Sequence, residues 1–156
     1  MIFFNRRPKY DLAGKYAAED VACYIVNKCV HDAKKITNLQ LQKIMYYIQR
    51  DFLQKQNRAL VKDEIEAWIY GPVVPAVYSR YCGFGSSDLY DIEEPDTTFD
   101  AGERRIIDAI VEEKRALWPW AMVNDTHKKG GAWDRIYRDG LGEHSIIPKE
   151  VIAAYG

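Results

Sequence analysis

Hydrophobic residues in the first third of the chain repeat with the period of an α-helix. Between residues 15 and 32 the apolar positions recur at helical spacing, with charged or polar residues between them: Val21, Ala22, Ile25 and Cys29. A longer stripe follows the i, i+3, i+4, i+7, i+11 pattern: Leu41, Ile44, Met45, Ile48 and Phe52. Thr37 and Gln40 stand ahead of it at the spacing of a capping box, which predicts a helix from Thr37 to about Gln56.

The next segment alternates with the period of a strand. Over residues 64–70 the side chains on one side of an extended chain are all apolar: Ile65, Ala67 and Ile69. Pro72 and Pro75 follow, and proline is tolerated in the first turn of a helix because its missing N–H has no intrahelical partner there. We therefore expect a short strand and then a helix over residues 72–81. The residues expected to face the core from this helix are Val74, Val77, Tyr78 and Tyr81.

The C-terminal half carries further helical patterns separated by breaks. Residues 83–99 read as an irregular acidic loop. Asp100 and Glu103 repeat the capping spacing and open a long helix that Pro119 ends or kinks, marked by Ile106, Ile107, Ile110, Val111 and Leu117. A shorter helix follows, to about Thr126. Two more features complete the pattern: a turn holding Trp133 and Ile136 after Gly130 and Gly131, and a last helix from Pro148 to Tyr155.

Length and composition turn these elements into a fold prediction. A chain of 156 residues, 47% of them hydrophobic, has the size of one domain with one core. The expected fold is mainly α: a compact single-domain bundle of about six helices, with a short β-strand or hairpin near residues 60–70. Residues 1–14 are expected to be an N-terminal extension and residues 15–156 the helical domain.

Cysteine use and the lengths of the apolar segments predict a cytoplasmic protein. The three cysteines form no CxxC pair and cannot all pair within the chain, as expected of reduced thiols in a cytosol. The run Ile2, Phe3, Phe4 is too short for the apolar region of a signal peptide. No apolar stretch reaches the roughly 18 residues needed to cross a bilayer. We therefore expect no membrane partner.

Residue types that build catalytic and metal sites occur without the spacing that such sites need. His31, His127 and His144 lie far apart, and none has the i, i+4 spacing of a helical metal pair, so no metal is expected. No glycine-rich segment matches a phosphate-binding loop, and no cofactor is expected. The prediction is a protein that is not an enzyme. The alternative is an enzyme whose site assembles from distant residues such as His127, Cys82 and Glu66.

Charged residues are segregated into two stretches. Residues 34–62 are basic apart from Asp51: Lys34, Lys35, Lys43, Arg50, Lys55, Arg58 and Lys62. Residues 88–100 are acidic: Asp88, Asp91, Glu93, Glu94, Asp96 and Asp100. The net charge of −1 disfavours a general nucleic-acid-binding protein, because phosphate neutralisation needs a surplus of Lys and Arg. The two stretches either attract one another as solvated faces or steer a charged protein partner.

Aromatic residues are a second signal for a binding protein. Eleven Tyr and four Trp exceed what a small core needs, and both types are enriched at interface hot spots. For each tryptophan taken singly, core or half-buried packing is the favoured interpretation: Trp68, Trp118, Trp120 and Trp133. Together the aromatic residues favour an interaction surface, and the same surface could serve a homo-oligomer.

Two sequence blocks resemble a known family. The first is TNLQLQKIMYY at residues 37–47, and the second is EAWIYGPVVPAVY at residues 66–78. With the Thr126-His127 pair ahead of Trp133, they resemble the Panacea domain family, which includes SocA-like and phage-associated GepA-like antitoxin domains. The resemblance covers about residues 15–155.

The resemblance implies a function in protein binding. It implies an antitoxin that neutralises a cognate toxin by direct contact, or an adaptor that delivers the toxin to a protease–chaperone complex. The candidate partner-binding residues are those of the two blocks and the downstream pair: Gln42, Lys43, Tyr46, Tyr47, Trp68, Tyr70, Gly71, Pro72, Val73, Tyr78, His127 and Trp133. For His127 a local role ranks first, as a cationic imidazole at the C-terminal end of its helix. The further alternative is a phage-derived regulator that binds a host protein or nucleic acid through residues 34–62.

Overall fold

The computed structural model describes residues 9–156, in which the chain forms seven α-helices, two 3-10 turns and three strands. The helices are α1 (Ala18–His31), α2 (Asn38–Gln56), α3 (Pro75–Tyr81), α4 (Ala101–Lys114), α5 (Pro119–Thr126), α6 (Ala132–Tyr137) and α7 (Lys149–Tyr155). The 3-10 turns are η1 (Cys82–Phe84) and η2 (Arg138–Gly140), and the strands are β1 (Ile65–Trp68), β2 (Gly71–Val73) and β3 (Ser145–Ile147). The predicted mainly α fold with a small β element is confirmed. The apolar run Ile2, Phe3, Phe4 lies outside the described residues.

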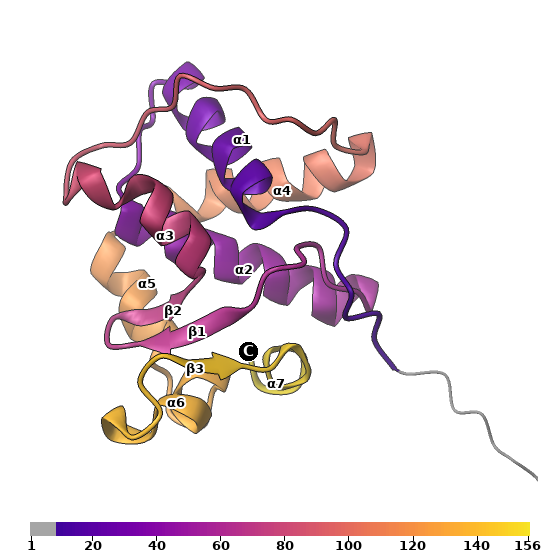
Figure 1. Ribbon diagram of the computed structural model, residues 1–156, viewed down its shortest axis with the longest axis vertical. Coiled ribbons are helices and arrows are strands. Elements are labelled where there is room, and N and C mark those ends of the chain that lie inside the picture. Colours follow the sequence, from indigo (N-terminus) through magenta and orange to yellow (C-terminus); the bar gives the residue numbers. More distant parts are fainter. Residues whose placement is uncertain (1–8) are drawn as a thin grey trace, which may run out of the picture.

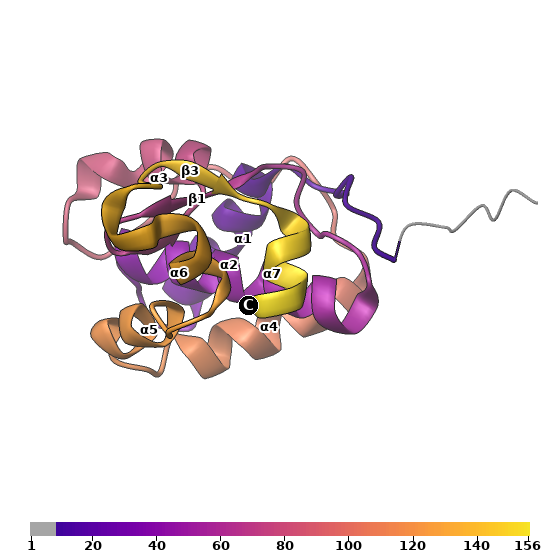
Figure 2. The same cartoon turned by 90° about the horizontal axis from the view of Figure 1, so that it is seen from below.

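Helix α2 runs through the middle of the molecule and is covered on nearly every side. Figure 1 shows α1, α3 and α4 on one side of it, and the sheet with α6 and α7 on the other. The view from below in Figure 2 places α4 and α5 along a further side. Twelve of its 19 residues are buried, so it is the core element around which the other helices pack. The predicted stripe lies wholly in this core: Leu41, Ile44, Met45, Ile48 and Phe52.

Both ends of α2 follow from the local sequence. Thr37 Oγ1 accepts a hydrogen bond from the Gln40 amide (3.4 Å), and Gln40 Oε1 accepts one from the Thr37 amide (2.9 Å). This is the predicted capping box, which satisfies amides that a helix start leaves unpaired. After the last turn Asn57 adopts a left-handed conformation (φ 54°), and its amide donates to the Phe52 carbonyl. The predicted boundaries of this helix are confirmed.

The sheet is antiparallel, with strand order β2-β1-β3. β1 confirms the predicted strand, although it ends at Trp68, and Ile69 is exposed in the turn instead of packing inward. Ala67, in the centre of the sheet, pairs with Pro72 of β2 and with Ser145 of β3. β3 was not predicted, because a strand of three residues is too short to show alternation.

The hairpin corrects the expected start of the following helix. Pro72 lies in β2, not in a helical turn, and α3 begins at Pro75. Gly71 has a φ of 110°, which side chains rarely allow, and this lets the chain reverse tightly into β2. Because β2 is an edge strand, the missing N–H of Pro72 is tolerated there. Tyr78, expected to face the core, is 39% exposed on α3.

Other boundaries in the C-terminal half also differ from the expectation. α4 ends at Lys114, and Leu117 is exposed in the connection to α5 instead of lying on a longer helix. Trp133 and Ile136 lie on α6, a helix of six residues that is too short for a periodic pattern. The predicted helices to Thr126 and to Tyr155 are confirmed as α5 and α7. None of the helices within residues 9–156 combines the length and hydropathy that a membrane span needs.

A buried carboxylate joins the N-terminal segment to α4. Asp100 caps α4 as predicted, but Glu103 does not reach back to complete a capping box. Instead its carboxylate accepts hydrogen bonds from the Tyr16 hydroxyl (2.6 Å), Lys15 Nζ (2.9 Å) and Arg58 Nη2 (2.7 Å). Burial raises the pKa of Glu103, but these three donors outweigh burial and hold the pKa below its ordinary value. The carboxylate is therefore ionised and ties three segments together.

Gln49 fixes the chain that follows α2. Its side chain is buried and forms hydrogen bonds with three backbone groups of Leu60 and Val61, in the segment between α2 and β1. Gln49 Oε1 accepts from the amides of Leu60 (2.9 Å) and Val61 (3.1 Å), and Nε2 donates to the Val61 carbonyl (3.2 Å). Buried backbone groups without a strand partner need such bonds. Gln49 therefore positions the chain that leads into β1.

We expect Gln49→Leu to lower the free energy of unfolding by about 2 to 4 kcal/mol, because three buried backbone groups lose their partner. Gln56→Leu is the matched control: this glutamine is exposed at the end of α2, and its replacement should change stability by less than about 0.5 kcal/mol. Urea unfolding of the three proteins gives the comparison. Equal midpoints for Gln49→Leu and wild type would show that the hydrogen bonds of Gln49 contribute nothing to stability.

Candidate partner-binding site

A groove of about 380 Å³ opens between the first half of α2, the β1–β2 hairpin and α3. We call it the aromatic groove, and its lining residues are Asn38, Leu39, Gln42, Lys43, Trp68, Ile69, Tyr70, Val73, Tyr78, Cys82 and Gly85. Both sequence blocks that carry the family resemblance contribute to it. The structure therefore brings together six of the twelve predicted residues: Gln42, Lys43, Trp68, Tyr70, Val73 and Tyr78.

The rim of the aromatic groove is a set of exposed or half-buried aromatic rings. Tyr70, at the hairpin tip, is 53% exposed. Trp68 is held on three sides: its Nε1 donates to Glu66 Oε1 (3.0 Å), and its ring meets Tyr78 edge-on (4.9 Å) and stacks on His144 (4.5 Å). Because these contacts fix the indole, little side-chain entropy remains to be lost when a partner binds.

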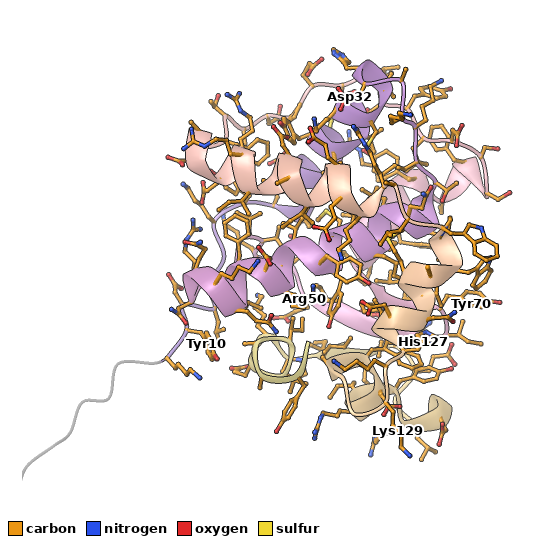
Figure 3. All side chains as sticks on the ribbon, turned by 180° about the vertical axis from the view of Figure 1, so that it is seen from behind. Tyr10, Asp32, Arg50, Tyr70, His127 and Lys129 are labelled. Atoms are coloured by element: carbon orange, nitrogen blue, oxygen red, sulfur yellow. The ribbon has the colours of Figure 1, made fainter. Side chains whose placement is uncertain are left out.

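The start of α5 carries two exposed tryptophans that were not among the predicted residues, and one of them, Trp120, extends this rim. Trp118 is 73% exposed and Trp120 is 45% exposed, whereas core or half-buried packing was expected for both. Trp120 meets the Tyr70 ring edge-on at 5.7 Å, which joins α5 to the hairpin tip. Figure 3 shows Tyr70 at the edge of the molecule beside α5. The two tryptophans flank Pro119, the first residue of α5.

Five of the other six predicted residues are buried and have a structural role instead of lining the groove: Tyr46, Tyr47, Gly71, Pro72 and Trp133. Gln42 has a similar role although it lines the groove. Its Oε1 accepts from the Val74 amide (2.9 Å), and its Nε2 donates to Asn38 Oδ1 (2.9 Å). Tyr47 donates its hydroxyl hydrogen to Asp125 Oδ2 (2.6 Å) and so links α2 to α5. These side chains fix the elements that carry the exposed rings.

Lys43 does not belong to the basic surface expected of residues 34–62, because it is fully buried. Its Nζ donates to the Pro72 carbonyl (3.1 Å), and it forms no ion pair with a carboxylate in the described part of the chain. Burial lowers the pKa of Lys43 to about 7. A side chain on Gly71 would collide with Lys43 Cε and Thr126 Oγ1, each 2.8 Å from an added Cβ. The buried Lys43 side chain thus leaves room only for glycine at position 71. The hydrogen bond of its amine to Pro72 holds the hairpin against α2.

His127 also differs from the expectation of a helix-capping cation. It follows the last residue of α5, but its ring stacks on Trp133 (3.7 Å), and its Nε2 is buried without a hydrogen-bond partner among residues 9–156. Burial, and secondarily the charge of Lys43, lower the pKa of His127, so the neutral imidazole is favoured. Trp133 Nε1 donates to the Trp68 carbonyl (2.8 Å). The stack therefore supports the end of β1 from below.

The residues of the enzyme alternative do not meet at one place. Cys82 is exposed and lines the aromatic groove, whereas neither Glu66 nor His127 belongs to the described lining. Glu66 is bonded to Trp68, and His127 is stacked on Trp133. Within residues 9–156 no group of three or more His, Cys, Asp or Glu side chains is placed to hold a metal ion.

Lys43→Met tests the burial of the amine. Because the folded-state pKa (about 7) lies below the ordinary value of 10.5, the unfolded chain binds more protons between these pH values, and wild-type stability rises with pH there. The variant should lose that slope, which is at most about 1.4 kcal/mol per pH unit. Urea unfolding of both proteins across this pH range gives the two slopes. Parallel curves would contradict a buried neutral amine.

Two comparisons with known proteins find a match. Residues 41–134 match the family described as "Antitoxin SocA-like, Panacea domain", a range that includes most of α2, the hairpin, α3 and α5. The chain is 30% identical over 132 residues to antitoxin SocA of Caulobacter vibrioides (strain NA1000 / CB15N), across 76% of this chain and 69% of that protein. No solved structure matches the chain significantly. The resemblance seen in the sequence is confirmed, and the chain belongs to the family of SocA-like antitoxins with a Panacea domain.

Proposed function

We propose that this protein neutralises a toxin encoded beside its gene by binding it directly and stoichiometrically. Membership of an antitoxin family supports a toxin as the partner. The observation that carries the proposal is the pair of exposed rings, Tyr70 and Trp120, that meet edge-on beside the aromatic groove. The proposed action needs no cofactor and no catalytic residue, and it takes place in the cytoplasm.

The chemistry of the rim suits a protein interface. Tyr and Trp supply large contact areas and often dominate binding energy at the centre of an interface. Trp68 is fixed by Glu66, Tyr78 and His144, and the hairpin behind it is fixed by buried side chains of α2. A surface that is already ordered loses little entropy on binding. The groove therefore fits an apolar side chain or helix edge of the partner.

The two forms of antitoxin action differ in what happens after binding. A blocking antitoxin leaves the toxin intact in a complex, whereas an adaptor lowers the amount of toxin by delivering it to a protease–chaperone complex. We propose blocking, because an exposed, preformed aromatic surface is sufficient for it. Toxin levels followed by immunoblot, with and without this protein, separate the two actions.

Co-expression with the neighbouring open reading frame is the direct test of the function. We expect the neighbour to stop growth when expressed alone, growth to recover when this protein is co-expressed, and the two chains to co-purify at a fixed ratio. A neighbour that is harmless alone and fails to co-purify would rule out the toxin assignment.

Tyr70→Ala and Trp120→Ala test the location of the interface. Each should weaken affinity for the co-purified partner about 30-fold, because an exposed ring at an interface centre contributes about 2 kcal/mol when it is truncated. Tyr90→Ala is the matched control, since Tyr90 is equally exposed but does not line the aromatic groove. Isothermal titration calorimetry gives the affinities, and circular dichroism verifies the fold. If Tyr90→Ala weakens binding as much as Tyr70→Ala, the interface lies elsewhere.

A further inference from the structure

Lys43 borders the aromatic groove although its side chain is fully buried. In the described part of the chain its amine makes one hydrogen bond, from Nζ to the Pro72 carbonyl at 3.1 Å. Gly71 lies against the same amine, since an added Cβ there would be 3.1 Å from Nζ. Lysine is almost never fully buried unless its charge is paired, so the protonation state of this amine affects what the groove can hold.

No carboxylate compensates a charge on this amine. Lys43 forms no ion pair in the part of the chain that the structure describes, and its lowered pKa is caused by burial. The carboxylates on two neighbouring elements are engaged elsewhere: Glu66 on β1 accepts from Trp68, and Asp125 on α5 accepts from Tyr47. An ammonium at this position would therefore lack the ion pair that a buried charge needs.

The other base near this amine would carry a charge of the same sign. Burial lowers the pKa of His127, at the end of α5, and the charge of Lys43 lowers it further, whereas Asp134 on α6 acts in the opposite direction. Tyr78 of α3 and Cys82 of η1 border the groove as well, and neither supplies a carboxylate. Two bases thus share one poorly hydrated space beside the hairpin, which disfavours a proton on either.

Filling the aromatic groove changes the surroundings of this amine. The lining of the groove holds no carboxylate and no cation other than Lys43, so solvent in the groove is what stabilises a charge from this side. An apolar side chain or helix edge of a partner displaces that solvent. Displacement penalises the ammonium far more than the neutral amine, which keeps its hydrogen bond to Pro72.

Near neutral pH the free protein holds both forms of the amine. Burial lowers the pKa of Lys43 to about 7, so roughly half of the molecules carry the proton at that pH. A filled groove lowers the pKa further, because the charged form loses its remaining solvent. Proton uptake and occupation of the groove therefore oppose each other, and by linkage each weakens the other by the same factor.

We propose that occupation of the aromatic groove is coupled to the loss of one proton from Lys43, so that the partner binds the form with a neutral amine. The identity of the partner rests on the proposed function, whereas the coupling belongs to the groove itself. Affinity is then independent of pH in mildly alkaline solution. It falls as the pH drops below neutral, by up to about tenfold per pH unit.

Isothermal titration calorimetry with the co-purified partner measures the released proton. Titrations in two buffers of different ionisation enthalpy should give more than about half a proton released per complex near pH ~6.5, and almost none near pH ~8.5. Lys43→Met should lose this release at the lower pH, whatever its affinity. Equal proton release by Lys43→Met and wild type would overturn the proposal.

His127→Phe is the matched control for the neighbouring base. The substitution removes the imidazole but keeps a ring that can stack on Trp133, and Nε2 of His127 has no hydrogen-bond partner to lose among residues 9–156. We expect this variant to release its proton as the wild type does. Loss of the release in His127→Phe, with release retained in Lys43→Met, would assign the proton to the histidine and overturn the role of Lys43.

A measurement on the free protein separates failure of this inference from failure of the toxin proposal. Cys82 is the exposed cysteine of the three and lines the aromatic groove, so benzyl methanethiosulfonate attaches an apolar ring there. NMR of the protein with carbon-13-labelled lysine should show one lysine that titrates near neutral pH. The benzyl group should lower that titration by at least about one pH unit, and methyl methanethiosulfonate, which adds a single methyl group, should lower it less.

This measurement needs no substitution and no partner. If every lysine titrates near its ordinary pKa, or if the benzyl group leaves the unusual lysine unchanged, the coupling is wrong even when a toxin binds. If the benzyl group lowers the titration but no complex forms with the neighbouring gene product, the coupling stands and the toxin proposal fails.

Discussion

The burial of α2 is the constraint on which the rest of the structure depends. A helix covered on nearly every side must place its polar side chains among apolar neighbours, and each such group is costly unless it finds a partner. Gln42 accepts a hydrogen bond from the amide at the start of α3, and Lys43 donates one to the Pro72 carbonyl of the hairpin. Gln49 forms hydrogen bonds with the chain before β1. The polar residues of the central helix thereby determine where the surrounding non-helical segments lie.

This constraint links the interior to the proposed binding surface. The hairpin tip reaches solvent with Tyr70, but its base is anchored by Lys43 on one side and by the Trp133–His127 stack on the other. Residues of the family motif that never touch solvent therefore shape a surface by holding its exposed members. A residue can therefore belong to the motif without touching a partner.

Elements whose contacts are local can be predicted from the sequence, whereas those that depend on distant partners cannot. The capping box of Thr37 and the stripe along α2 contain their own information, so this helix was predicted within one residue. Pro72 was placed in a helix because its pairing with β1 comes from the reversal at Gly71, and the burial of Lys43 follows from packing that no charge pattern reveals. For the binding surface, the motif includes Tyr70, but Trp120 meets that ring only through the placement of α5.

The pairing of β3 with β1 has a consequence for how the protein is made. β1 is synthesised long before residues 145–147, so during translation one of its edges exposes unpaired N–H and C=O groups. An open edge of this kind invites pairing with other nascent chains. Ribosomal synthesis therefore leaves the sheet unfinished until the C-terminal strand emerges, and a chain truncated before residue 145 keeps one edge of β1 open to such pairing.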